Sequence, residues 1–367
     1  MGAMQKPKIV IYVRAISGGA GKNAVKYANI LAEHGNDVIL TCGHAPSLNQ
    51  YIPDPSVQLE VFGTKRNLSA VAPLRRILAQ HDPDICLVVD ASNLPAMLLS
   101  LSACPSRPKL ILREALSTWE RTQMRGLFMR KFKWLVHKLG YRQCDLVIAL
   151  TQQMVTELRR HWGVPENRIA LIPNGVSVEK HPDPVRKREA NRIVCVARLE
   201  EQKDIATLLR AFAILRQNIT CKLSIAGTGR LEKYLKTLTR TLEIEGDVDF
   251  LGHVDDTETL YASAHLAVLP SLWEGFPNVV IEALAQGTPV VATRIPGAVE
   301  ILENSGAGLL CKIGDPHDLA TKILQALSQD WDRAEIHNRA YHFSNEKLEE
   351  RVLEAVKPDT ILAERRI

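Results

Sequence analysis

The sequence predicts two α/β domains in tandem, each built on a doubly wound parallel sheet. Short apolar runs rich in Val, Ile and Leu alternate with stretches of helical apolar spacing, as in parallel sheets covered by helices on both faces. The alternation stops in a polar, proline-containing segment at residues 177–192, which we interpret as a linker, and then restarts. The 367 residues suffice for two domains of ordinary size.

The first half begins with a strand at 8–13, a glycine-rich turn at 18–21 and a helix at 23–34 that Gly35 ends. Further strands, with helices between them, are expected at 37–41, 57–62, 85–89, 109–113 and 145–149. A turn cluster, Ile-Pro-Asn-Gly at 172–175, precedes the linker. The first domain is therefore expected to span residues 4–178.

The second half repeats the pattern. Strands are expected at 192–197, 221–226, 248–251, 266–270, 289–292 and 308–311, with helices at about 204–217, 229–244, 277–287 and 315–328. The second domain is expected to span 179–344, and a charged helix at about 345–367 is expected to pack back on the first domain. Because ligands of doubly wound sheets bind beyond the carboxyl ends of the strands, we expect a cleft between the two domains.

Composition indicates a soluble globular protein, with 46% hydrophobic and 24% charged residues. No apolar run approaches the ~18 residues that span a bilayer, and we find no secretion signal at the start of the chain. The seven cysteines are spread along the chain without a C-x-x-C pair. This pattern favours reduced thiols in the cytoplasm over a disulfide framework or a zinc cluster.

The net charge of +5 is divided unequally between the halves. Residues 1–180 contain 23 Lys and Arg against 13 Asp and Glu, a net charge of +10, whereas residues 181–367 contain 23 against 28, a net charge of −5. The first half is therefore expected to be attracted to an anionic surface: a membrane, a nucleic acid or a phosphorylated substrate.

The stretch 271–291, SLWEGFPNVVIEALAQGTPVV, contains the most informative candidate site. Pro277 suits the first turn of a helix, and the amides of the next three residues would then be free to bind an anion such as a diphosphate. Glu282 follows one turn later on the same face as Asn278, and Glu274 lies in the preceding loop; carboxylates suit sugar hydroxyls. The alternative is that both glutamates are solvated or interact only with the helix dipole.

A second candidate lies in VCVARLEEQK at 194–203. A strand is expected to end at Ala197, so Arg198 emerges at the carboxyl end of the second sheet, and Lys203 follows at the start of the next helix. Two cations there could neutralise a diphosphate and stabilise the charge that grows on it as it leaves. The alternative is that these cations only form a salt bridge with Glu200 or Glu201.

A third stretch, SGGAGK at 17–22, would let backbone approach a phosphate closely. It is not a Walker A loop, because Ile16 and Asn23 stand where that motif has Gly and Ser or Thr. It is not a dinucleotide fingerprint either, because the glycine spacing differs.

Together and in this order, these stretches resemble the retaining glycosyltransferases of family 4, which have the GT-B fold of two Rossmann-like domains. The resemblance extends from Ile9 to about Phe343. Its motifs are IPNGV, ARLEEQK, IAGTGRLE, FLGHV and EGFPNVVIE, the last with the E-x7-E spacing of Glu274 and Glu282. Many members of this type build bacterial polysaccharides or lipopolysaccharides.

The resemblance implies roles for individual residues. Arg198 and Lys203 are expected on the donor diphosphate, Glu274 on the transferred sugar and Glu282 on the donor ribose; the first three are the expected catalytic residues. The other expected donor-binding residues are Gly18 and Gly19 at the phosphate, Gly227, Thr228, Gly252, His253 and Val254 near the base, and Gly275, Phe276, Pro277, Asn278 and Val279 at the sugar and phosphate. The family transfers with retention, and the leaving phosphate is expected to take the acceptor proton.

The chain departs from the family pattern in places that bear on the donor sugar. Arg113-Glu114 stands where many members have a His near that sugar, Gly21-Lys22 stands where an acidic residue is frequent, and Asp204 replaces a Gly. Two D-x-D triplets, at 82–84 and 247–249, resemble metal-binding pairs of other glycosyltransferases. We interpret them as loop carboxylates, and neither a metal nor a cofactor is expected.

The segment 119–142 is strongly basic, with seven Lys and Arg and one acid, Glu120. Aromatic and aliphatic residues are interleaved with the cations, as in a helix that lies on an anionic bilayer. The expected membrane or acceptor contacts are Arg121, Arg125, Arg130, Lys131, Lys133, Trp134 and Lys138. Alternatively, the apolar positions are core and the cations solvated, or the cations bind a phosphorylated acceptor. Nucleic acid is not expected, because no nucleic-acid fold signature is present.

We therefore expect a retaining, metal-independent glycosyltransferase that moves a hexose or N-acetylhexosamine from a UDP-sugar to a hydroxyl of a glycan or lipid-linked acceptor, in bacterial surface polysaccharide synthesis. It is expected in the cytoplasm, bound peripherally to the inner face of the membrane. One alternative is a UDP-sugar epimerase of the same architecture, and another is an inactive nucleotide-sugar-binding subunit. A nicotinamide dehydrogenase is suggested by the first glycine-rich turn alone.

Overall fold

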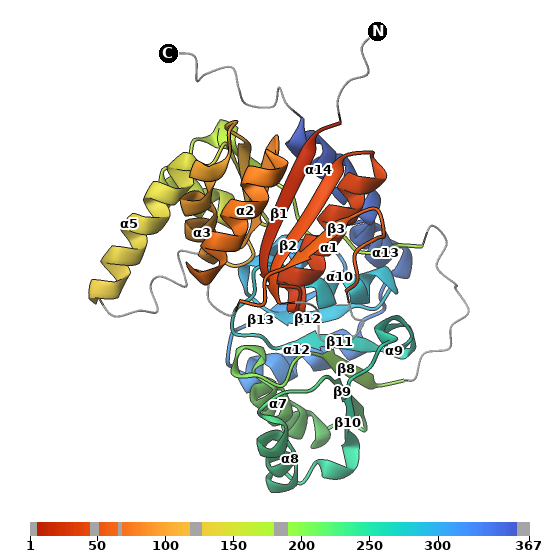
Figure 1. The fold of residues 1–367 in the computed structure, drawn as a ribbon. Helices are drawn as coiled ribbons and strands as arrows, with labels where there is room; N and C mark the ends of the chain where they lie inside the picture. The colour runs from red at the N-terminus through yellow and green to blue at the C-terminus, as the bar shows by residue number, and fades with distance from the viewer. Residues whose placement is uncertain (1–5, 45–50, 65–67, 118–126, 180–189, 358–367) are drawn as a thin grey trace. The chain divides into compact units, whose positions relative to one another are not determined.

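The computed structural model describes residues 6–44, 51–64, 68–117, 127–179 and 190–357, with the backbone alone for 127–133. The chain divides into two compact units (Figure 1). Unit 1 comprises Met1–Asn174 and Leu348–Ile367, and unit 2 comprises Gly175–Lys347. The sequence placed the first boundary four residues later, and most of the linker, residues 180–189, lies outside the described residues.

Unit 1 is built on a parallel sheet of seven strands in the order β3-β2-β1-β4-β5-β6-β7. The strands are β1 (Lys8–Ala15), β2 (Asp37–His44), β3 (Gln58–Val61), β4 (Ile85–Val89), β5 (Lys109–Arg113), β6 (Leu146–Ala149) and β7 (Ile169–Leu171). The sequence predicted six of these. It missed β7, whose three residues lie at the edge of the sheet and remain partly exposed, so that they lack the apolar run of a buried strand.

The helices of unit 1 alternate with these strands, as predicted. They are α1 (Gly18–Glu33), α2 (Val71–His81), α3 (Leu94–Ser100), α5 (Leu127–Gln143), α6 (Gln152–Glu157) and α14 (Asn345–Val356), with short helical turns η1 (Leu68–Ala70), η2 (Ala91–Asn93), η3 (Leu101–Ala103), η4 (Leu158–Trp162) and η5 (Glu166–Arg168). Helix α1 begins five residues earlier than expected, because the glycine-rich stretch forms its first turn and is not a separate loop.

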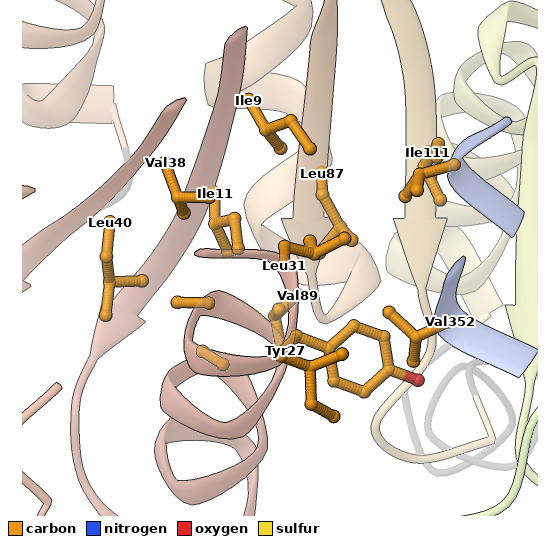
Figure 2. Close-up of a cluster of buried hydrophobic side chains, with 14 of the residues drawn as sticks. Ile9, Ile11, Tyr27, Leu31, Val38, Leu40, Leu87, Val89, Ile111 and Val352 are labelled. Carbon is orange, nitrogen blue, oxygen red and sulfur yellow. The ribbon is translucent and has the colours of Figure 1, made fainter. Parts of the chain in front are cut away.

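One core of unit 1 joins segments that are far apart in the sequence. Ile9, Ile11 and Leu87 project from the sheet toward Tyr27 and Leu31 of α1 (Figure 2). Leu348 and Val352 of α14 are buried in the same core. The Lys109 ammonium also donates to the carbonyls of Ala355 (3.0 Å) and Lys357 (2.8 Å). The C-terminal helix therefore completes the first unit.

Unit 2 is built on a parallel sheet of six strands in the order β10-β9-β8-β11-β12-β13. The strands are β8 (Arg192–Val196), β9 (Lys222–Ala226), β10 (Val248–Gly252), β11 (Leu266–Leu269), β12 (Val290–Thr293) and β13 (Gly308–Cys311). All six were predicted to within a residue or so, because each is a short apolar run between polar turns.

The helices of unit 2 cover a core formed by these strands. They are α7 (Ile205–Arg216), α8 (Glu232–Thr241), α9 (Thr257–Ser263), α10 (Asn278–Ala285), α11 (Pro296–Leu302), α12 (Pro316–Ser328) and α13 (Arg333–Tyr341), with turns η6 (Glu201–Lys203) and η7 (Glu245–Asp247). No helix among the described residues of either unit is long and apolar enough to cross a membrane.

Candidate functional site

Backbone hydrogen bonds join the segments at the carboxyl ends of β8, β9 and β10 in unit 2. The Leu199 amide donates to the Thr228 carbonyl (3.0 Å), and the Gly227 amide donates to the Gly252 carbonyl (2.6 Å). A Cβ on Gly227, whose φ is +136°, would lie 1.9 Å from the Ala197 carbonyl oxygen. Only glycine fits this approach, so the three loops that follow β8, β9 and β10 form one fixed platform.

Arg198 extends outward from this platform. Its neighbours Ala197 and Leu199 are buried and hydrogen-bonded, whereas Arg198 itself is exposed. Within the described part of the chain, no acidic side chain forms an ion pair with Arg198. A fixed backbone thus presents a guanidinium at the carboxyl edge of the sheet, where such a group can bind an anion.

Lys203 and Glu274 form an ion pair that links two loops. Their side chains are only 13% and 12% exposed. The Ser271 hydroxyl donates to the same carboxylate at 3.0 Å, and the Gln202 amide nitrogen lies 3.4 Å from its other oxygen. The Gln202 side chain also donates to the Trp273 carbonyl at 2.7 Å. Turn η6 is therefore held against the loop that precedes α10.

The alternative that Lys203 pairs with a neighbouring glutamate is wrong. Glu200 and Glu201 pair instead with Arg230, at 2.8 and 3.2 Å. Those carboxylates lie beside the loop after β9, whereas Lys203, the last residue of η6, points to the loop after β11. The sequence could not distinguish these partners, because Glu274 lies 71 positions away in the chain.

The start of α10 differs in detail from the expectation. Pro277 is the cap residue before the helix, which begins at Asn278. The Val280 amide donates to the Pro277 carbonyl (3.0 Å), so the prediction of three free amides is wrong at Val280, because the tight turn at the proline uses that donor. The preceding residues Gly275 and Phe276 are buried, and a Cβ on Gly297 would lie 2.5 Å from the Pro277 ring.

Glu282 lies in the second turn of α10, close to the buried Tyr261 of α9. Burial raises the pKa of the Tyr261 hydroxyl well above its usual value, and the negative charge of Glu282 raises it further. Glu274 belongs to the loop pair with Lys203, so the two carboxylates of the E-x7-E motif have different environments. His253, also predicted near the donor, is exposed and lies 3.1 Å from Asp255, while Val254 is partly exposed.

In unit 1, the predicted phosphate loop is the first turn of α1. Gly18 has a φ of +58°, which favours glycine, and a Cβ on either Gly18 or Gly19 would meet nothing within 4 Å. Gly21 is packed against the Ile16 backbone, 2.7 Å from where its Cβ would be. The Asn23 side chain donates to the Gly19 carbonyl (2.8 Å) and fixes the turn. The backbone at Gly18-Gly19 is therefore open to a ligand.

A buried polar cluster at the end of β5 was noticed in the sequence only as a departure from the family pattern. Arg113 is 1% exposed and donates to the Asn174 side chain (2.5 Å) and to the Glu114 carbonyl (3.1 Å). Its guanidinium also lies over the Tyr27 ring, 5.7 Å from the centroid. The buried Glu114 carboxylate accepts a hydrogen bond from Tyr141. The sequence signal was a charged pair that directly follows an apolar strand.

The basic segment 119–142 is described only in part. Arg121 and Arg125 lie outside the described residues, and Arg130, Lys131 and Lys133 lie in α5 where the backbone alone is described. Trp134 is partly buried, and the Lys138 ammonium lies 4.4 Å from the centre of its ring. The structure therefore describes the side chains of this segment from residue 134 onward.

Both D-x-D triplets are used in contacts within the chain. Asp82 accepts hydrogen bonds from Ser106, which lower the pKa of its carboxyl, and Asp84 accepts from the Lys8 amide (2.8 Å). Asp247 pairs with Arg216 and Lys222 at 2.7 and 2.9 Å. Across the described ranges, no group of three or more His, Cys, Asp or Glu side chains is arranged to hold a metal ion.

Comparison with known families matches both units. The profile described as "Glycosyltransferase Family 4" matches residues 17–180, and the profile described as "Glycosyl transferases group 1" matches residues 177–343. The two profiles together cover residues 17–343, and the chain belongs to the glycosyltransferases that they describe. Arg198, Lys203, Glu274 and Glu282 all lie in the group 1 region, and the Gly18-Gly19 turn lies in the family 4 region.

Several curated proteins are similar to this glycosyltransferase. An uncharacterized glycosyltransferase of Haemophilus influenzae is 29% identical over 81% of this chain and 83% of its own. The N-acetyl-alpha-D-glucosaminyl L-malate synthase of Bacillus anthracis is 25% identical over 98% and 95%. An N-acetyl-D-galactosaminyltransferase of Campylobacter jejuni, whose name specifies an undecaprenol-diphosphate-linked saccharide, is 27% identical over 88% and 89%.

Solved structures give the fold of this glycosyltransferase. The Anabaena protein Alr3699/HepE in complex with UDP-glucose is similar with a TM-score of 0.77, at 20% identity, over 95% of this chain and 98% of that one. The lipopolysaccharide biosynthesis glycosyltransferase WaaG is similar with a TM-score of 0.71, at 17% identity, over 95% and 98%. With two parallel α/β units, these likenesses confirm the predicted GT-B fold.

Proposed function

We propose that the enzyme transfers a sugar from a UDP-sugar to a hydroxyl of a glycan or lipid-linked acceptor, with retention and without a metal. The main support for this proposal is the Lys203–Glu274 ion pair. The pair holds the Lys203 ammonium beside the loop that precedes α10, and it fixes the orientation of the Glu274 carboxylate in that loop. Arg198 extends from the platform after β8 in the same unit. Two cations and a fixed carboxylate suit a diphosphate that bears a sugar.

The roles proposed for these residues are those that the resemblance to the family 4 glycosyltransferases implies. Arg198 and Lys203 bind the donor diphosphate and stabilise the charge that develops when the bond from the sugar to the phosphate breaks. Glu274 accepts hydrogen bonds from hydroxyls of the transferred sugar, and Glu282 from hydroxyls of the ribose. The leaving phosphate oxygen takes the proton from the acceptor hydroxyl as the new glycosidic bond forms. No dedicated protein base is then required, and the two cations take the place of a metal at the diphosphate.

Backbone groups complete the proposed donor site. The platform of Gly227, Thr228 and Gly252 would contact the base, and the amides at the start of α10 would contact sugar and phosphate. In unit 1, the open backbone at Gly18-Gly19 is suited to bind a phosphate group. The choice of UDP is supported by the neighbour that binds UDP-glucose.

The acceptor is proposed from the charge of the first half of the chain and from the relatives. Residues 1–180 have a net charge of +10, which favours an acceptor at an anionic surface. One relative is named for an undecaprenol-diphosphate-linked saccharide, while another is named for L-malate, so the family accepts more than one kind of hydroxyl. We propose a role in surface polysaccharide synthesis, at the cytoplasmic face of the membrane.

The test is incubation of the protein with a panel of UDP-sugars, with and without lipid-linked and soluble glycan acceptors. We expect transfer with retained anomeric configuration, unchanged by a metal chelator. Lys203→Ala and Glu282→Ala should each lower turnover at least about a hundredfold, since each removes a charged contact to the donor. Absence of donor binding and turnover across the whole panel would refute the proposal.

Matched controls separate chemistry from folding. Lys233→Ala and Glu258→Ala remove exposed side chains of the same types in the same unit, and we expect full activity from both. Thermal unfolding of all four variants should show a folded protein. Conversion of the UDP-sugar in the absence of any acceptor would indicate an epimerase instead, and full activity in Lys203→Ala would show that the site is assigned wrongly.

A further inference from the structure

The donor loop (residues 274–277) is contacted by two elements that follow it in the chain of unit 2. Helix α11 begins against the loop, since a Cβ on Gly297 would lie 2.5 Å from the Pro277 ring and 2.9 Å from the Gly275 carbonyl oxygen. The Phe343 ring, which follows α13, packs on the Phe276 ring with the centroids 5.5 Å apart and the planes at 57°. Both rings are buried. The position of the donor loop therefore depends on packing from outside the motifs that contain the donor site.

Arg339 of α13 joins these two contacts. Its guanidinium donates to the carbonyls of Ile301 (2.7 Å) and Glu300 (2.6 Å) in the last turn of α11, where a cation is favoured by the helix dipole. The same guanidinium lies over the Phe343 ring, 5.1 Å from its centroid, in a cation–π contact. One side chain thus fixes both the helix and the ring that contact the donor loop.

The backbone of Phe343 is also held in place. Its carbonyl accepts a hydrogen bond from the Val176 amide (2.9 Å), and the Asn345 amide donates to the Val176 carbonyl (2.9 Å). These bonds form a parallel bridge between Val176 and Ser344. The bridge joins the two ends of unit 2, which spans Gly175–Lys347. Phe343 is therefore fixed at its backbone by the bridge and at its ring by the Arg339 guanidinium.

We propose that Phe343 and Arg339 are positioning residues of the donor site, which hold the donor loop in the geometry that presents Glu274 to the transferred sugar. They act through Phe276 and not by contact with the donor. A small displacement of a loop that orients a substrate lowers the rate of transfer strongly, because the reacting groups are no longer aligned. The inference rests on the proposed function for the identity of the ligand.

The first test compares two ligands by isothermal titration calorimetry: UDP, and the UDP-sugar that the unsubstituted protein binds most tightly. Phe343→Leu should weaken binding of the UDP-sugar at least about fivefold, the size of an aromatic pair contact. It should weaken binding of UDP less than about twofold, because the platform after β8, β9 and β10 is assigned to the nucleotide and the donor loop to the sugar. Arg339→Met should give the same pattern, with a loss of about threefold for the UDP-sugar.

The second test needs no donor. In the ligand-free protein, hydrogen exchange followed by mass spectrometry should be faster in peptides that cover residues 271–279 of Phe343→Leu and Arg339→Met, because local opening becomes easier when a packing contact is lost. Peptides from β9 and α8 of the same unit should exchange as in the unsubstituted protein.

Matched controls separate positioning from stability. Phe212→Leu alters a fully buried phenylalanine in the core of unit 2, on α7, and Arg333→Met alters an exposed arginine on α13. We expect Phe212→Leu to lower the melting temperature without changing the ratio of the two affinities or the exchange of the donor loop. Arg333→Met should change none of these quantities.

Three results would overturn the proposal: unchanged exchange of the donor loop in Phe343→Leu, equal losses of affinity for UDP and the UDP-sugar, or the same selective loss in Phe212→Leu. Faster exchange of the loop in Phe343→Leu, together with no binding of any UDP-sugar by the unsubstituted protein, would support the contact of Phe343 with the loop and refute the proposed donor. The two proposals therefore fail in different measurements.

Discussion

Arg113 is buried at the carboxyl end of β5, and no acidic side chain in the described segments forms an ion pair with it. A buried cation without a carboxylate is costly unless its donors are satisfied. Asn174 supplies a side-chain oxygen at 2.5 Å, and the Tyr27 ring faces the guanidinium. Asn174 is also the last residue of unit 1 before the chain enters unit 2, so this hydrogen bond fixes the exit point of the chain.

We expect Asn174→Ala to lower the free energy of unfolding by roughly 1–3 kcal/mol, because it leaves a buried guanidinium donor without its acceptor. Urea denaturation followed by circular dichroism measures the change. Asn218→Ala is the matched control; Asn218 is exposed after α7, and its replacement should change stability by less than about 0.5 kcal/mol. Equal stability of the two variants would contradict the assigned role.

Tyr12 makes the free energy of unfolding depend on pH in the alkaline range. Burial raises the pKa of this tyrosine from 10.0 to about 12. Between these values the unfolded chain loses the phenol proton while the folded protein keeps it, so stability falls as pH rises through this window. Well below pH 10 the contribution of Tyr12 to the free energy of unfolding does not change with pH.

The variant Tyr12→Phe should therefore lose less stability between pH 10 and 12 than the unsubstituted protein, by up to about 2–3 kcal/mol. Urea midpoints measured at several pH values in this range give the comparison. Tyr234→Phe, at a tyrosine that is 49% exposed, should leave the pH dependence unchanged. Parallel curves for Tyr12→Phe and the unsubstituted protein would show that Tyr12 does not carry this effect.

At the scale of elements, the platform after β8, β9 and β10 depends on glycine at one position. Gly227→Ala should lower stability by more than about 2 kcal/mol and weaken UDP binding, because its Cβ would collide with the Ala197 carbonyl and its φ disfavours side chains. Gly246→Ala, in turn η7 with open space around it, is the control and should change stability by less than about 0.5 kcal/mol. Thermal unfolding with and without UDP measures both effects.

The sequence was most informative where burial and local pattern agree. Strands such as β4 and β12 are continuous apolar runs, so their positions were predictable to within about a residue. The start of α1 was not predictable, because glycines have a low helix propensity. Here the glycines form the first turn of the helix, which is held by a hydrogen bond to the Ser17 carbonyl and by the Asn23 side chain. The partner of Lys203 was also unpredictable, since tertiary contacts bring η6 and the loop after β11 together.

At the scale of the whole molecule, the chain passes through all of unit 2 and then returns to unit 1 with α14. The sequence suggested this from its position and charge, but it could not say which residues are buried. In the structure Leu348, Val352, Ala355 and Val356 enter the core formed by β1, β4 and α1. Periodicity identifies an apolar stripe, but the partner of that stripe is set by topology.

We expect Leu348→Ala to destabilise unit 1 by roughly 2–5 kcal/mol, because Leu348 is 1% exposed within the core that contains Ile9 and Tyr27. Hydrogen exchange followed by mass spectrometry locates the effect. Peptides from β1 and α1 should lose protection, while peptides from β8 and α7 in unit 2 should keep it, since amide protection reports the stability of each cooperative unit. Leu324→Ala, at a leucine that is 38% exposed on α12, should leave both sets unchanged. Loss of protection confined to unit 2 would mean that α14 stabilises the unit that precedes it in the chain and not the one whose core it completes.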